Sequence, residues 1–447
     1  MPSLTTLKIV IIGYVWPEPN SSAAGQNMLS IIKQCKDAGH CISFLTAATD
    51  SDHKADLDEL GIDNHTIELN SSSFDNVIAS MAPDVVIFDR YMTEEQFSWR
   101  VKEACPNALR VLNTEDLHSL RQARLDAVKT HCDAAKANLN SELAQREIAS
   151  ILRSDITLVI SRRELNLLTT YYGIPASQLR YHPLEVGKII EDAPTFEERA
   201  HFVHIGNFRH APNWDAVLQL KQTIWPAIRK QIPQAELHIY GAYPPKKATQ
   251  LHNKQQGFLV KGWAESAEDV IKQARVLITP IRFGAGIKGK LLDAARCATP
   301  SITTWLGTEG ILFDEDITNW PGAVCPAVYT EQQDSKEGSA KVVAINDAVS
   351  DYVKCAVSLY NEKDDWQQAS RKTIPLLSNY AASKLQQTLV DSFVHLSNNI
   401  QTHRDGLFLQ SLVWHQSLTA SKYMSQWIEA KNANLETLRN DKNDESH

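Results

Sequence analysis

The chain has 447 residues, of which 43% are hydrophobic and 22% are charged, and its formal net charge is −8. This length predicts two domains, and the composition excludes a globally disordered chain, a collagen and a bundle of membrane helices. The negative charge argues against a nucleic-acid partner and against broad attraction to anionic lipid, because both need clustered lysine and arginine.

Localisation and redox state can also be predicted from the composition. The sequence holds no run of about 18 apolar residues, and residues 1–8 lack the regions of a secretory leader. We therefore expect a cytoplasmic protein with no transmembrane segment and at most peripheral membrane contact. The seven cysteines are scattered without a C-x-x-C pair, so they are expected to be buried reduced thiols and not zinc ligands.

The first half of the chain alternates short β-branched apolar runs with longer amphipathic stretches. This is the pattern of a parallel sheet covered by helices. A helix is predicted over 27–38, and the expected strands are 8–12, 41–46, 84–89, 109–113 and 156–160. Residues 1–187 are therefore assigned to an N-terminal Rossmann-like domain.

The same pattern restarts after an acidic connection over 191–199. The expected strands of this second half are 202–206, 235–241, 258–260, 275–280 and 301–304. They predict a second doubly wound domain over 188–374, so the fold class is α/β with two tandem Rossmann-like domains. The polar stretch 331–342 lacks periodicity and is expected to be a surface loop.

The chain is predicted to be mostly helical from Asp364, and residues 375–447 form a helical C-terminal tail. Its first part is expected to pack back on the N-terminal domain, followed by one or two helices over 405–435 and a solvated end from Asp441. The helical region that begins at Asp364 has an apolar face that consists of Trp366, Leu376, Leu377, Tyr380, Leu385, Leu389 and Phe393.

The strongest functional pattern follows the strand 275–280. Its glycines allow positive φ and close backbone approach, and the amides at the start of the next helix point at whatever lies before them, so a diphosphate fits there. The glycines are Gly284, Gly286 and Gly289. Lys288 and Lys290 would add positive charge, and Asp293 could accept hydrogen bonds from ribose. The alternative is a glycine-rich turn with two solvated lysines.

Residues 202–311 resemble the donor-binding domain of group 1 (family 4) glycosyltransferases, which have the GT-B fold. The segments that carry the resemblance are 206–217, 224–226, 235–241, 262–263, 280–290 and 307–310. It implies a retaining transferase whose two domains face a cleft, with a nucleotide-diphosphate sugar on the C-terminal domain. It also implies that no metal and no further cofactor is required, and no Asp-x-Asp motif follows a strand.

The residues expected to bind the donor come from this pattern and this resemblance. They are Gly25, Gly206, Gly284, Gly286, Ile287, Lys288, Lys290, Asp293 and Glu309. The chain departs from the Glu-x7-Glu motif of the family, because the second acid falls on Asp293 but the first falls on Ala285. Since that first glutamate commonly contacts the sugar, the departure leaves sugar identity and full activity open.

Four residues are predicted to take part in catalysis, and they are Asp116, His118, Arg209 and Lys288. Asp116 and His118 lie in an ionisable segment just beyond a strand, and it resembles an Asp-Leu-His-x-Leu-Arg stretch of similar transferases. His118 could bind the sugar or acceptor, or act as an acid or base. A structural histidine is the alternative. Arg209 could pair with a phosphate or be a surface residue.

Three further features have simpler explanations. The loop 13–25 places Gly25 at a helix start, where it could close over the donor or follow a plain N-cap at Asn20 or Ser21. Ser161 and Glu164 fit a capping box. The pair Asp89 and Arg90 could face the cleft or form a surface ion pair.

The sequence thus predicts a metal-independent retaining glycosyltransferase with an unidentified glycan, lipid-linked or protein acceptor on the side of the N-terminal domain. The alternatives are a nucleotide-sugar epimerase or phosphorylase of the same fold, and a degenerate binding protein without catalysis. A nicotinamide-dependent dehydrogenase is disfavoured because residues 13–25 lack the G-x-G-x-x-G pattern.

Overall fold

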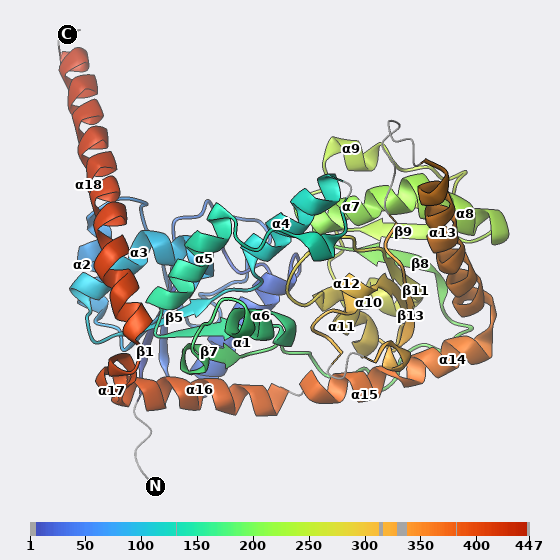
Figure 1. Cartoon of the computed structure of the whole chain (residues 1–447), viewed down its shortest axis with the longest axis horizontal. Coiled ribbons are helices and arrows are strands. Elements are labelled where there is room, and N and C mark those ends of the chain that lie inside the picture. Colours follow the sequence, from blue (N-terminus) through green and yellow to red (C-terminus); the bar gives the residue numbers. More distant parts are fainter. Residues whose placement is uncertain (1–5, 131, 313–315, 329–337, 381, 445–447) are drawn as a thin grey trace.

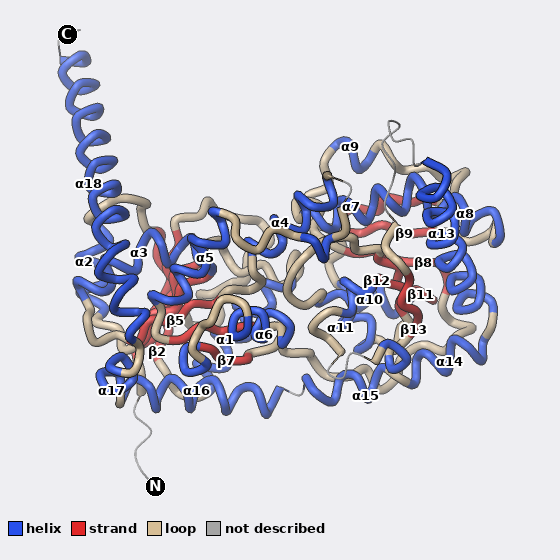
Figure 2. Tube along the Cα trace, viewed as in Figure 1, coloured by secondary structure: helices blue, strands red, loops and turns tan. Residues whose placement is uncertain are grey.

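The computed structural model describes residues 6–130, 132–312, 316–328, 338–380 and 382–444. It has two lobes, each built on a twisted parallel sheet with helices on both faces (Figures 1 and 2). The predicted fold class, two tandem Rossmann-like domains with a helical C-terminal region, is confirmed. No helix in the described part of the chain is both long enough and apolar enough to cross a membrane.

The N-terminal lobe contains a seven-stranded sheet in the order β3-β2-β1-β4-β5-β6-β7. Its strands are β1 Lys8–Gly13, β2 Cys41–Thr46, β3 Asp63–Thr66, β4 Val85–Asp89, β5 Leu109–Asn113, β6 Ile156–Val159 and β7 Leu179–Tyr181. Its helices are α1 Ala23–Asp37, α2 Ser73–Met81, α3 Arg90–Ala104, α4 His118–Lys129, η1 Ala134–Lys136, α5 Glu142–Arg153, α6 Arg162–Thr170 and η2 Ala176–Gln178.

The C-terminal lobe contains a six-stranded sheet in the order β10-β9-β8-β11-β12-β13. Its strands are β8 Ala200–Ile205, β9 Leu237–Tyr240, β10 Phe258–Gly262, β11 Ala274–Thr279, β12 Ser301–Thr304 and β13 Gly322–Cys325. Its helices are α7 Ala211–Gln219, η3 Leu220–Ile224, α8 Trp225–Gln231, α9 Lys246–Thr249, α10 Ala267–Gln273, α11 Gly289–Arg296, α12 Trp305–Thr308, η4 Ile317–Asn319 and α13 Gly338–Asn361.

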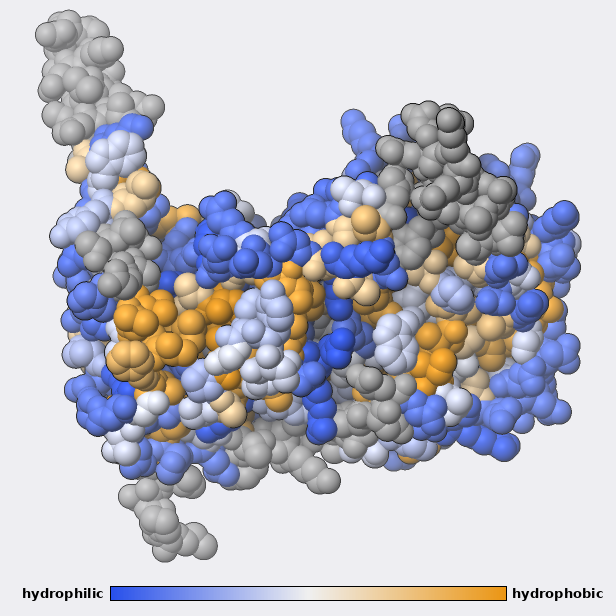
Figure 3. Space-filling model, in the orientation of Figure 1, coloured by the Kyte–Doolittle hydropathy of each residue, from blue (hydrophilic) through white to orange (hydrophobic). Residues whose placement is uncertain are grey.

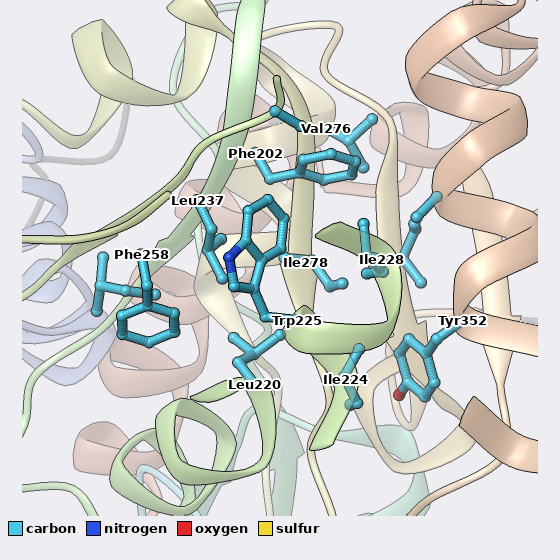
Figure 4. Packing of buried hydrophobic residues seen from close by; sticks show 14 of the residues in the cluster. Phe202, Leu220, Ile224, Trp225, Ile228, Leu237, Phe258, Val276, Ile278 and Tyr352 are labelled. Atoms are coloured by element: carbon cyan, nitrogen blue, oxygen red, sulfur yellow. The ribbon is translucent and has the colours of Figure 1, made fainter. Parts of the chain in front are cut away.

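The core of the C-terminal lobe gathers around Trp225, whose indole lies among side chains from the sheet (Figure 4). Its Nε1 donates to the carbonyl of Gln256 at 2.8 Å, so the one polar atom of a buried side chain has a partner. Tyr352 of α13 closes the same cluster from the outer side. Burial of this apolar face explains why α7, α8 and α13 cover one side of the sheet.

The tail runs from the C-terminal lobe along both lobes and ends as a long helix that projects from the N-terminal lobe (Figure 1). Its elements are α14 Lys363–Arg371, α15 Thr373–Leu377, η5 Ser378–Tyr380, α16 Ala382–Asn398, α17 Ile400–Asp405 and α18 Phe408–Asp444. Leu376 and Leu377 are buried in the C-terminal lobe, whereas Leu389 and Phe393 are buried against the N-terminal sheet. The tail therefore ties the two lobes together.

Three other predictions need correction. Within the stretch 331–342, residues 331–337 lie outside the described residues, and 338–342 form the start of α13 and not a loop. Residues 441–444 belong to α18, so the solvated end does not begin at Asp441. Of the seven cysteines, all free, Cys41 and Cys132 are exposed and not buried.

The sequence patterns missed three strands, β3, β7 and β13. β3 is a polar edge strand, and β7 has only three residues, so neither carries the apolar run by which a strand is recognised. β13 begins with glycine and has half-buried side chains. Each is recruited by pairing with a neighbouring strand and not by its own propensity.

Candidate active site between the two lobes

The loop 283–290, which follows β11, meets the N-terminal lobe directly. A Cβ placed on Gly286 would lie 2.8 Å from the Cβ of Asp116, and one placed on Gly289 would lie 2.8 Å from the Cβ of Ala23. Hydrophilic side chains fill the strip between the lobes (Figure 3). The structure therefore describes a closed arrangement in which these glycines permit the approach.

The backbone of this loop has the conformation that its glycines predict. Gly284 has φ 151° and Gly286 has φ 62°, both in the region that glycine favours. Lys288 is the N-cap residue of α11, so the amides that follow it lie at the start of a helix. The loop thus joins a strand's carboxyl end to a helix N-terminus, which is a common anion-binding geometry.

The amides of the loop fall into two groups. The amide of Gly286 donates to Oε1 of Glu164 in the N-terminal lobe at 2.7 Å, so it is already used by the protein. Within the described chain, no protein acceptor is found for the amides of residues 287–290. The diphosphate site predicted from the sequence therefore loses one amide and keeps four.

Lys290 and Gly206 lie together beside the loop. Nζ of Lys290 donates to Oδ1 of Asn213 at 2.6 Å, and a Cβ placed on Gly206 would lie 2.6 Å from that Nζ. Burial lowers the pKa of Lys290 to about 7. Any bulkier residue at 206 would displace the ammonium, so the glycine is required by the lysine.

Lys288 is the second cation of the loop. Its Nζ donates to the carbonyl of Gly286 at 3.1 Å. Burial lowers the pKa of Lys288, and the nearby Glu309 carboxylate opposes this shift. Two lysines held in place by the protein thus flank the four amides. The alternative left open by the sequence, a glycine-rich turn with two solvated lysines, is therefore not observed.

Two other predicted donor-binding residues lie in α11 or just before it. Burial raises the pKa of Asp293 to about 6, and this carboxylate lies one turn into the helix, as predicted. Ile287 is buried in an apolar cluster that includes Ile160 of the N-terminal lobe. Its side chain therefore serves domain contact, and only its backbone is left for a ligand.

Arg209 lies just past β8 at the rim of the cleft. Its guanidinium stacks on the ring of Tyr243, with 3.7 Å between Cζ and the ring centroid. The hydroxyl of Tyr243 donates to Oε1 of Glu18 in the opposite lobe at 2.8 Å. The ring of Trp263 stacks on His53, also of the opposite lobe, at 4.7 Å. Arg209 is thus held at a second point of contact between the lobes.

Glu309 follows β12 and faces α4 of the N-terminal lobe. Its two carboxylate oxygens accept from Nη1 and Nη2 of Arg124 at 2.7 and 2.8 Å, and Arg163 Nε lies 3.6 Å away. Burial alone would raise the pKa of Glu309, but the bonds from Arg124 hold it below its usual value. This predicted donor ligand is therefore engaged in an ion pair across the cleft.

Asp116 and His118 lie together at the end of β5. His118 Nε2 is 3.5 Å from Asp116 Oδ1, and Arg121 forms an ion pair with the same carboxylate. Burial lowers the pKa of His118 to about 4, although Asp116 opposes the shift. For Asp116, Arg121 and then His118 outweigh burial and hold the pKa well below its usual value. The pair is thus a neutral imidazole beside a carboxylate.

The start of α1 differs in detail from its prediction. The N-cap is Ser22, whose Oγ accepts from the amide of Gly25 at 3.0 Å, and it is neither Asn20 nor Ser21. A Cβ on Gly25 would lie 2.3 Å from the carbonyl oxygen of Glu18. Gly25 is therefore required by the fold of the loop 13–25.

The capping box predicted for Ser161 and Glu164 is wrong. Ser161 is the N-cap of α6 but its side chain makes no capping bond. Glu164 instead accepts from the amides of Leu117 and Gly286, and burial raises its pKa to about 8. A capping box depends only on local spacing, whereas the partner of Glu164 comes from the other domain.

The pair Asp89 and Arg90 is not a surface ion pair. Both side chains are largely buried at the carboxyl end of β4, 3.9 Å apart, and Arg90 has φ 71°. The Arg90 guanidinium lies over the ring of Tyr14, with 5.2 Å between Cζ and the ring centroid. A non-glycine residue in this backbone region is strained, which is frequent near ligand sites.

Comparison with known proteins gives one match to a family model, within the C-terminal lobe and α13. Residues 199–345 match the family described as Glycosyl transferases group 1. No curated protein matches the chain significantly. Among solved structures, a glycosyltransferase from Rickettsia africae superposes with a TM-score of 0.60 at 10% identity, covering 88% of this chain and 99% of that chain.

Two further solved structures give the same result. Sucrose-phosphate synthase from Thermosynechococcus elongatus has a TM-score of 0.58 at 15% identity, covering 87% of this chain and 99% of that chain. HepE from Anabaena, in complex with UDP and glucose, has a TM-score of 0.57 at 11% identity, covering 87% of this chain and all of that chain. These likenesses confirm the predicted GT-B fold over most of the chain.

Proposed function

We propose that this chain, a group 1 glycosyltransferase with the GT-B fold, transfers a glycosyl group from a nucleotide-diphosphate sugar on the C-terminal domain to an acceptor held by the N-terminal domain. One observation carries the donor site. The amides of residues 287–290, which bond to no acceptor in the described part of the chain, lie beside the ammonium groups of Lys288 and Lys290 at the carboxyl edge of the sheet.

The amides and lysines would act mainly as the glycosidic bond breaks. Departure of the diphosphate concentrates negative charge on its oxygens, and donors already fixed in place stabilise that charge more in the transition state than in the ground state. Arg209, at the rim, would add a third cation. Closure of the lobes excludes water and brings donor and acceptor together.

We further propose that the reaction retains the anomeric configuration and needs no divalent metal. Retention follows from the resemblance of residues 202–311 to the retaining family. Metal independence is supported by the two lysines, because ammonium groups can neutralise a diphosphate where other transferases use a metal ion. The cytoplasmic location stays a prediction.

The acceptor side is proposed to be formed by Asp116 and His118. The neutral imidazole can accept a hydrogen bond from a hydroxyl of the sugar or acceptor, and Asp116 fixes its orientation. A saccharide, a lipid-linked glycan or a protein glycan would each offer such a hydroxyl. HepE was solved with UDP and glucose, so a UDP-sugar is the donor class to test first.

The test is binding and turnover with purified full-length protein. UDP, GDP and ADP are compared by the rise in melting temperature and by calorimetry, and ¹³C-labelled sugar donors of the nucleotide that binds are then followed by mass spectrometry. We expect one nucleoside diphosphate to bind and Lys288→Ala to weaken that binding at least tenfold. Binding by none of the three would remove the donor site.

The fate of the donor separates this function from its alternatives. Conversion of the sugar without any acceptor indicates an epimerase, and binding without hydrolysis or transfer indicates a binding protein. Hydrolysis of the donor in water, with release of the nucleoside diphosphate, is the expected result for a transferase that lacks its acceptor.

A further inference from the structure

We propose that Arg124 and Glu164 are positioning residues that hold the loop segment 284–286 from the opposite lobe, so that the diphosphate amides are set only in the closed cleft. This inference rests on the proposed function for the role of the loop in donor binding. The contacts themselves are independent of it. Neither residue was predicted to bind donor or acceptor from the sequence.

Arg124 makes three hydrogen bonds across the cleft. Its Nη1 donates to the carbonyl of Gly284 and to Glu309 Oε2, each at 2.7 Å, and its Nη2 donates to Glu309 Oε1 at 2.8 Å. The two charged side chains are only 11% and 12% exposed. A bidentate pair that is shielded from water is geometrically specific, unlike most surface ion pairs.

Glu164 holds the loop two residues further on. One oxygen, Oε1, accepts from the amide of Gly286 at 2.7 Å and from the amide of Leu117 at 3.1 Å. Glu164 is buried. Its two hydrogen bonds join the loop to the turn that carries Asp116 and His118. The same side chain thus links the donor loop to the acceptor side of the cleft.

Apolar contacts support the same segment. Ala285, between Gly284 and Gly286, packs against an apolar cluster of the N-terminal lobe. Phe283 lies in a small cluster with Val128 of α4 and Ala134 of η1. Residues 283–286, which belong to the C-terminal lobe, thus all contact the N-terminal lobe.

Glycines make this outside support necessary. Gly284 and Gly286 have many accessible backbone conformations, so the loop loses considerable entropy when it becomes fixed. In the open cleft the contacts from Arg124 and Glu164 are broken, and nothing about the glycines selects the binding conformation. The apparent dissociation constant for donor then rises in inverse proportion to the fraction of closed, ordered molecules.

The deciding measurement is hydrogen exchange in the segment 284–286 of the full-length, ligand-free protein, followed at the amide of Gly286, which bonds to Glu164. We expect Arg124→Ala and Glu164→Ala each to speed exchange in this segment at least tenfold, because the segment is then held less often. Lys129→Ala is the matched control, since Lys129 is an exposed cation of the same helix. Glu164→Gln is the second control, because its amide oxygen can still accept from both backbone amides.

The outcomes separate this inference from the proposed function. Equal exchange in Arg124→Ala, Glu164→Ala and Lys129→Ala would overturn the positioning role. Equal acceleration by Glu164→Gln and Glu164→Ala would overturn the assignment of Glu164 as a backbone acceptor. Calorimetry with UDP is run on the same proteins, and we expect at least tenfold weaker binding in Arg124→Ala. Absence of UDP binding by the wild type bears only on the donor site, because the exchange result stands without it.

Discussion

Nζ of Lys290 donates a hydrogen bond to Oδ1 of Asn213, 77 residues earlier in the chain, at 2.6 Å. This bond fixes an ammonium group beside the start of α11, in a place where burial lowers the pKa of Lys290 to about 7. A lysine that is partly neutral before a ligand binds has a direct consequence for the binding of an anion.

Binding of UDP is expected to take up a proton near neutral pH. The diphosphate favours the charged form of Lys290, so its pKa rises on binding, and affinity falls as pH rises above 7, by up to tenfold per pH unit. Calorimetry in two buffers of different ionisation enthalpy measures the uptake. Lys290→Met should abolish most of it and weaken UDP binding at least tenfold, whereas the exposed Lys254→Met should change neither. An unchanged proton uptake in Lys290→Met would contradict this assignment.

His118 is expected to act in its neutral form. Burial lowers its pKa to about 4, so the imidazole is neutral across the physiological range, and its protonation should reduce kcat/KM only below about pH 5. His118→Ala should lower kcat by about 100-fold while the protein stays folded. The exposed His65→Ala serves as control. An acid limb centred near pH 6.5 would show that a different group titrates.

Gly286→Ala should lower kcat/KM because it causes a clash between the lobes. The substitution combines φ 62° with a Cβ 2.8 Å from the Cβ of Asp116, so the closed cleft would have to open. Gly173→Ala is the matched control, because it has φ 67° but no atom within 4 Å. Both variants should lose about 1 kcal/mol of stability from backbone strain, and only Gly286→Ala should lose kcat/KM, by at least tenfold. Similar kinetics for both would argue against closure as the cause.

Ala285→Glu restores the acid that the family motif has at this position, and we expect it to lower turnover. Ala285 packs against an apolar cluster of the N-terminal lobe, next to residues that contact Glu164 and Asp116. A new carboxylate there is desolvated and lies near the charged carboxylate of Asp116, so it opposes closure. Initial rates should fall more for Ala285→Glu than for the uncharged Ala285→Gln. A gain of turnover in Ala285→Glu would instead indicate a direct role for that acid at the sugar.

The tail is expected to be held by Arg404. Its guanidinium donates to both oxygens of Asp155, at 2.9 and 2.7 Å. Burial alone would raise the pKa of Asp155, but Arg110 and Arg404 outweigh it and keep this pKa well below its usual value. Arg404→Ala breaks a buried pair and should cost about 3 kcal/mol in urea unfolding at pH 7. Because the pKa of Asp155 is depressed, this stabilisation exists above pH 4 and is lost as pH falls further. Exposed Arg371→Ala is the control, and an equal loss of stability in it would refute the role.

Much of the fold follows from patterns within single segments. The apolar runs that became β1, β2, β4, β5 and β6 are buried on both faces of a parallel sheet, so their composition alone identifies them. β3 and β13 could not be found in this way, because an edge strand is recruited by its neighbour. The end of the helical tail was also misjudged, since polar residues 441–444 continue α18.

The candidate site, like the fold, has features that local sequence determines and features that it does not. The freedom of Gly284 and Gly286 to adopt positive φ and the place of Lys288 at the start of a helix are local consequences of spacing, and the sequence by itself determined them. The partners of Glu164 and Glu309 were decided only by the tertiary structure. Spacing indicated that Glu164 belongs to a capping box. The side chain instead accepts a hydrogen bond from the donor that the fold brings within about 3 Å of it. That donor is the amide of Gly286, which lies in the other domain and more than a hundred residues away in the sequence.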